Sequence, residues 1–171
     1  MFVISPMSNI GSLEKRDIFL QHISDIADTT IATELDVLAY AWFCSADDNT
    51  AVPRQWVRGF EVYKTLESST VQHRSSDAYK RFRAAVGSES LLDRPSDLRY
   101  MRPLDIGFLT RPGVATIYQG QKHYETAVQS FWALEFVEEA NDPTVLLFQR
   151  YESKEEYESA LKESAVLQQY R

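Results

Sequence analysis

The segment GFEVYKTLESSTVQHRSSDAYKRFRAAV, residues 59–86, decides the fold of this chain. Its first residues alternate between two faces, as is typical of a β-strand. Helical spacing follows, but in two registers that do not share a face. We therefore predict a short helix that carries His73, then a break, then a second helix capped by Ser75 or Ser76. In this arrangement His73 is buried and faces its own sheet.

Apolar patterns of the same kind predict the other elements of the chain. Strands are expected at residues 2–5, 36–45, 55–65, 97–113, 130–140 and 144–151, and helices at residues 13–32 and 153–164. Pro6 ends the first strand and makes it an edge strand, and Pro103 breaks the fourth. Ser12 is the expected N-cap of the first helix. The order strand, helix, strand, strand, helix, strand predicts an α+β fold of the ferredoxin-like type, an antiparallel sheet with helices on one face.

An internal repeat relates the two parts of the sequence. A shift of 88 positions places residues 57–83 on residues 145–171 without a gap, and Val57, Phe60 and Tyr63 then fall on Val145, Phe148 and Tyr151. The repeat predicts two similar halves, residues 1–110 and 111–171, related by a pseudo-two-fold axis. The second half is truncated, because no clear long helix precedes its strands. Residues 114–130 show no pattern that predicts an element.

Composition excludes several classes of partner. The net charge of −7 argues against nucleic-acid binding, which needs a clustered positive field. No segment has the roughly twenty apolar residues that cross a bilayer, and the N-terminus does not resemble a secretory signal. Cys44, the one cysteine, cannot form an internal disulfide and is expected to be a small buried hydrophobe. We expect a cytoplasmic protein without a nucleic-acid or membrane partner.

Three motifs together resemble the antibiotic biosynthesis monooxygenase-like (ABM) proteins of the dimeric α+β barrel superfamily. They are VLAYAWF at residues 37–43, GFEVYKTLES at residues 59–68 and VQHRSSDAYKRF at residues 71–82. The resemblance covers residues 35–86 well and residues 131–171 weakly, and the family has no strict catalytic signature. The aromatic-rich first motif and the fused second half look like fungal members of tandem-repeat type.

The resemblance implies a barrel made of two ferredoxin-like sheets that pack face to face. Either the repeat supplies both sheets from one chain, or the chain forms a homodimer. The family implies a cofactor-independent monooxygenase that acts on an aromatic polyketide-like small molecule in secondary metabolism. A polyketide cyclase or isomerase on the same scaffold, and a non-catalytic small-molecule-binding barrel, remain as alternatives, because fold alone does not choose among them.

Five residues are candidates for the site. His73 is the expected general base, because an imidazole exchanges its proton near neutral pH. Tyr40 is the expected hydrogen-bond donor to the enolate oxygen that this base would create. Trp42, Tyr63 and Trp132 are expected to wall the substrate pocket. Each has a structural alternative, which is a bond from His73 to a backbone carbonyl and ordinary core packing for the aromatic residues.

The sequence predicts no metal site and no cofactor. The three histidines are scattered without the close spacing typical of ligand sets. The six glycines are not clustered into a phosphate-binding loop, and no nucleophile motif is present. His22 is expected on the surface of the first helix, and His123 falls in the segment without a predicted element.

Overall fold

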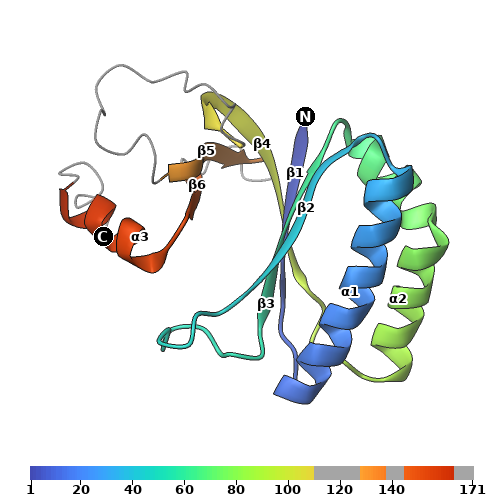
Figure 1. The fold of residues 1–171 in the computed structure, drawn as a ribbon. Helices are drawn as coiled ribbons and strands as arrows, with labels where there is room; N and C mark the ends of the chain where they lie inside the picture. Colours follow the sequence, from blue (N-terminus) through green and yellow to red (C-terminus); the bar gives the residue numbers. More distant parts are fainter. Residues whose placement is uncertain (110–127, 138–144, 164–171) are drawn as a thin grey trace. The chain divides into compact units, whose positions relative to one another are not determined.

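A computed structural model gives the structure of residues 1–109, 128–137 and 145–163 (Figure 1). The chain divides into two compact units, Met1–Arg102 and Pro103–Arg171. The domain boundary predicted between residues 110 and 111 lies outside the described residues and stays a prediction. Among the described residues, no helix combines the length and apolar character needed to cross a membrane.

The first unit has the ferredoxin-like order of elements that the sequence predicts. In chain order these are β1 (Phe2–Ser8), α1 (Leu13–Thr33), β2 (Val37–Cys44), β3 (Val57–Tyr63), η1 (Ser68–His73), α2 (Asp77–Ser88) and β4 (Asp97–Phe108), the last of which continues into the second unit. The strands of the first unit lie in the order β2-β3-β1-β4. The β2–β3, β3–β1 and β1–β4 pairs are all antiparallel. Both long helices cover the same face of this sheet (Figure 1).

The core of the first unit lies between the sheet and its two long helices. Its fully or nearly buried members are Ile10, Phe19, Ile23, Ile26, Val57, Ala78, Phe82, Val86 and Leu91. The members on α1 and α2 recur at helical spacing, which is why each helix has one face that must be buried. Ser12 caps α1 as predicted, because its side chain accepts a hydrogen bond from the backbone N–H of Lys15.

The first strand is longer and more central than the sequence predicts. It runs past Pro6 to Ser8 and pairs with both β3 and β4, so the prediction of an edge strand was wrong. Pro6 is tolerated because Gly59 on β3 leaves room for its ring, since a Cβ at Gly59 would lie 2.7 Å from Pro6 Cγ. Proline has no N–H to donate to the ladder. The Gly59 carbonyl instead accepts a hydrogen bond from the Ser5 hydroxyl at 3.1 Å.

The predicted helix break is confirmed. Residues Ser68–His73 form η1, a single stretch of π-helix, and α2 begins at Asp77. Ser76 is extended and its side chain accepts a hydrogen bond from the Tyr79 backbone N–H, which caps α2. π-Helical turns are rare and are frequently found at functional sites. Because of this break, the His73 side chain can point in a direction that differs from that of the side chains on α2.

The second unit contains a hairpin and a helix. Strands β5 (Val128–Phe136) and β6 (Val145–Tyr151) pair antiparallel, and α3 (Lys154–Glu163) follows. The bounds of β6 are those of β3 moved by 88 positions, and a helix follows each strand, in agreement with the predicted register. The superposition of the two halves stays a prediction, and its last part, residues 164–171, lies outside the described residues. Pro103 does not break β4, contrary to expectation, since the strand runs through it to Phe108.

Candidate functional site

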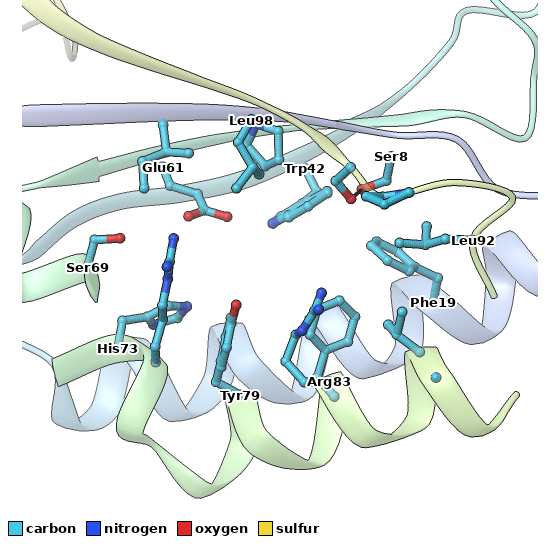
Figure 2. Close-up of a pocket in the computed structure, with 18 of the residues that line it drawn as sticks. Ser8, Phe19, Trp42, Glu61, Ser69, His73, Tyr79, Arg83, Leu92 and Leu98 are labelled. Carbon is cyan, nitrogen blue, oxygen red and sulfur yellow. Dashed lines mark hydrogen bonds between the residues drawn. The ribbon is translucent and has the colours of Figure 1, made fainter. Parts of the chain in front are cut away.

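A cavity of about 580 Å³ lies within the first unit, between the sheet and the long helices (Figure 2). Cavities of this size hold drug-sized ligands. Residues of β1, β2, β3 and β4 line it on one side, and residues of α1, η1 and α2 line it on the other. Four of the five residues predicted for the site, Tyr40, Trp42, Tyr63 and His73, line this cavity. The roles given to them stay predictions.

Aromatic rings form much of the cavity wall. Alternation along β2 turns Tyr40 and Trp42 to the helix side of the sheet. The Trp42 ring meets the Phe19 ring of α1 edge-on, with centroids 5.5 Å apart. Leu38 and Cys44, which share the parity of these two residues, lie at the ends of the strand and are exposed. The expectation that Cys44 is buried was therefore wrong, because the strand end carries it out of the packed layer.

His73 is held in a fixed orientation. It is 2% exposed, and its Nδ1 lies 2.8 Å from Oε2 of Glu34, the C-cap residue of α1. The predicted structural alternative was a bond to a backbone carbonyl, and the partner is a carboxylate instead. A carboxylate accepts the Nδ1 proton, which fixes the tautomer and leaves Nε2 as the nitrogen able to take up a proton.

Three tyrosine rings surround the imidazole of His73. The ring centroids of Tyr40 and Tyr79 lie 5.4 Å from that of His73, and the Tyr63 centroid lies 5.7 Å away. These rings come from β2, β3 and α2, so the sheet and the second helix both contribute to the setting of the histidine. The hydroxyl groups of these tyrosines bring hydrogen-bond donors to the aromatic part of the cavity wall.

Glu61 is a functional candidate that the sequence analysis missed. It is buried on β3, and its Oε2 accepts a hydrogen bond of 2.7 Å from the Tyr63 hydroxyl. Figure 2 shows its carboxylate directed into the cavity. Burial raises the pKa of Glu61 to about 7, although the Tyr63 bond and the charge of Arg74 act in the opposite direction. The sequence could have pointed to Glu61, because the alternation along β3 places it on the same face as Tyr63, which was a candidate for the site.

Two further donors lie beside these groups. Burial, and then the charge of Glu61, raise the pKa of Tyr40 well above its ordinary value, so its hydroxyl keeps its proton. The indole nitrogen of Trp42 is buried and has no hydrogen-bond partner among the described residues. It lies near Tyr40, where its N–H acts to lower the pKa of the Tyr40 hydroxyl, against the larger effect of burial. Its N–H points into the cavity in Figure 2. A ligand oxygen placed there would satisfy a donor that the protein leaves unpaired.

The remaining candidates lie elsewhere. Trp132 is 7% exposed on β5 of the second unit, opposite Phe148, and is not among the residues that line the cavity, so its binding role stays a prediction. His22 on α1 is part-exposed and lies 3.6 Å from a Glu89 carboxylate oxygen. His123 lies outside the described residues. Within the described part of the chain, no group of three or more His, Cys, Asp and Glu side chains could hold a metal ion.

Comparison with known proteins shows similarity in structure but not in sequence. No protein-family profile matches the sequence, and no curated protein matches it. The structure is similar to a proposed monooxygenase from Fusobacterium nucleatum, with a TM-score of 0.73 and 13% identity over 99% of this chain and 83% of the other. A proposed monooxygenase from Lactobacillus acidophilus gives a TM-score of 0.69 and 9% identity over 99% of this chain and 85% of the other.

A proposed antibiotic biosynthesis monooxygenase from Nitrosomonas europaea gives a TM-score of 0.50 and 19% identity, and it covers 58% of this chain and 95% of its own. At these identities the similarity shows the fold alone. The predicted fold class is confirmed: the chain is α+β, with the antiparallel sheet and helices of the ferredoxin-like, dimeric α+β barrel proteins.

Proposed function

We propose that this protein is a cofactor-independent monooxygenase that deprotonates an aromatic, polyketide-like small molecule of secondary metabolism and lets the resulting anion react with oxygen. The observation that carries this proposal is the position of two proton-exchanging groups, His73 and Glu61, on the wall of one aromatic cavity. Pairs of titratable groups in different environments are typical of sites that move protons. The monooxygenase assignments of structurally similar proteins support the choice of reaction.

The base in this proposal is His73, oriented by Glu34. Its Nε2 takes a proton from a methylene group that lies between aromatic or carbonyl groups, where the negative charge spreads onto an oxygen. The Tyr40 hydroxyl and the Trp42 N–H donate hydrogen bonds to that oxygen, which stabilises the anion as it forms. A base held by a third group in this way has the geometry of activated catalytic sites.

The oxygen chemistry draws its electrons from the substrate. The carbanion transfers electrons to O₂, a C–O bond forms, and protonation gives a hydroperoxide. Loss of the remaining C–H proton and cleavage of the O–O bond release water and leave a ketone, so one oxygen atom enters the product and the other enters water. Glu61, with a pKa of about 7, holds a proton near neutral pH that can be given to the departing hydroxide.

Oxygen uptake with an anthrone as substrate tests the proposal. We expect one O₂ consumed for each quinone formed, and a decrease in turnover of roughly 10²–10⁴-fold for His73→Ala. Because His73 is buried and paired with Glu34, this variant also loses stability, so turnover is expressed per folded molecule. His22→Ala is the matched control, since His22 does not line the cavity, and it should keep wild-type turnover.

Other outcomes identify the alternatives. Conversion of a poly-β-ketone into a ring without oxygen uptake would make the protein a cyclase or isomerase, which needs the same base but no oxidant. Binding of aromatic ligands without any turnover would make it a non-catalytic binding barrel. Full activity of folded His73→Ala would remove His73 from the chemistry and leave a structural role.

A further inference from the structure

The cavity wall carries more cations than the charge of the chain would suggest. Three arginines, Arg74, Arg83 and Arg94, line it against two carboxylates, Glu61 and Asp93, in a chain with a net charge of −7. This local excess of positive charge points to a ligand that carries negative charge.

Two of these arginines already have a partner. An Nη atom of Arg74 lies 3.4 Å from the hydroxyl of Tyr100. The guanidinium of Arg94 lies over the ring of Trp56, 5.6 Å from its centroid. Each of these two guanidinium groups is therefore held by a contact with the protein, although each keeps N–H donors, because stacking occupies the face of Arg94 and Tyr100 engages one nitrogen of Arg74.

Arg83 is different. It lies on α2, one turn after Tyr79 and one turn before Gly87, and all three residues line the cavity along the same row of the helix. No hydrogen bond, ion pair or ring contact joins the Arg83 side chain to another of the described residues. Figure 2 shows its guanidinium nitrogens directed into the cavity. The helix therefore presents a cation to the cavity that forms no ion pair with a carboxylate of the described residues.

We propose that Arg83 binds a carboxylate on the substrate, which would make the substrate an aromatic acid. This inference rests on the proposed function for the aromatic part of the substrate and adds the acidic group. The guanidinium matches a planar carboxylate with two parallel hydrogen bonds. A phosphate dianion would call for a second cation beside Arg83, and the other two arginines of the wall are held by their contacts with Tyr100 and Trp56. The ring system of the acid lies against Phe19, Trp42 and Phe82 in this arrangement.

Equilibrium binding of two matched ligands tests the inference without requiring turnover. The ligands are anthraquinone-2-carboxylate and its neutral analogue anthraquinone-2-carboxamide, measured by calorimetry or by quenching of tryptophan fluorescence. We expect the wild-type protein to bind the carboxylate up to about fivefold more tightly, as an ion pair with a solvent-exposed arginine provides. Added salt should reduce this preference.

Variants of two arginines on the same helix provide the contrast. Arg83→Gln should reduce the ratio of the two dissociation constants to about one, mainly through loss of carboxylate affinity. Arg81→Gln is the control, because Arg81 is exposed on α2 and does not line the cavity, and it should keep the wild-type ratio. Equal binding of the two ligands by the wild type, or an unchanged ratio in Arg83→Gln, would overturn the inference and leave the oxygenase proposal standing. Failure of both ligands to bind would overturn the aromatic substrate class and this inference together.

Discussion

Replacing Glu61 by glutamine should change how the stability of the protein depends on pH. The folded protein holds the Glu61 proton up to a pH of about 7, whereas the unfolded chain releases it near the ordinary value of 4.5. Below pH 4.5 the group is protonated in both states and burial carries no ionisation penalty. Between pH 4.5 and about 7 the free energy of unfolding therefore decreases as pH rises. Above this window the loss is complete.

The size of the effect follows from the two pKa values. At 1.36 kcal/mol for each pH unit, the full loss is roughly 3 kcal/mol, and roughly 2 kcal/mol of it falls between about pH 5.5 and about pH 8.5. This range stays above the pI of about 5.0, where solubility is lowest. Glu61→Gln cannot ionise and lacks this loss. The free energy of unfolding of Glu61→Gln, relative to that of the wild type, should therefore increase by roughly 2 kcal/mol between about pH 5.5 and about pH 8.5.

Urea unfolding followed by tryptophan fluorescence at several pH values measures this difference. Subtracting the wild type from the variant at each pH removes the contribution of all other titrating groups that the substitution leaves unchanged. Glu67→Gln is the control for replacing a carboxylate by an amide outside the cavity, because Glu67 is exposed just after β3. A difference for Glu61→Gln that stays constant within roughly 0.5 kcal/mol over the range would refute the reasoning. The carboxyl would then be solvated or paired in a way that keeps its pKa ordinary.

Three further substitutions test the packing that shapes the cavity. Ser76→Ala removes the side-chain cap on the Tyr79 N–H and should lower the free energy of unfolding by about 1 kcal/mol; an unchanged urea midpoint would contradict the capping role. Gly59→Ala places a Cβ 2.7 Å from the Pro6 ring and should cost about 1–3 kcal/mol, measured in the same way. Gly87→Ala has no atom within 4 Å of the new Cβ and should stabilise α2 by about 0.5–1 kcal/mol. If the two glycine variants had equal effects, the crowding at Gly59 would not be real.

The fold could be predicted from the sequence because its signals are local. Helix caps, alternation along strands and the break before α2 each depend on a few neighbouring residues. The break was predicted correctly, and Ser76 is one of the two residues, Ser75 and Ser76, between which the predicted cap was left open. The position of β1 could not be predicted in this way. In the sequence, Pro6 predicts the end of a strand. Only the tertiary structure shows that Gly59, on another strand, makes room for its ring.

For the candidate site as well, local patterns predicted some features and tertiary structure decided the others. Alternation and the helix break by themselves bring Tyr40, Trp42, Tyr63 and His73 to one side of the sheet, since each depends only on its own strand or helix. Tertiary structure alone decided what those residues meet. Glu34 lies 39 positions before His73 and becomes its partner because α1 ends beside η1. Glu61 looks like an ordinary strand residue until the helices remove water from around it, and this desolvation gives a carboxyl a pKa of about 7.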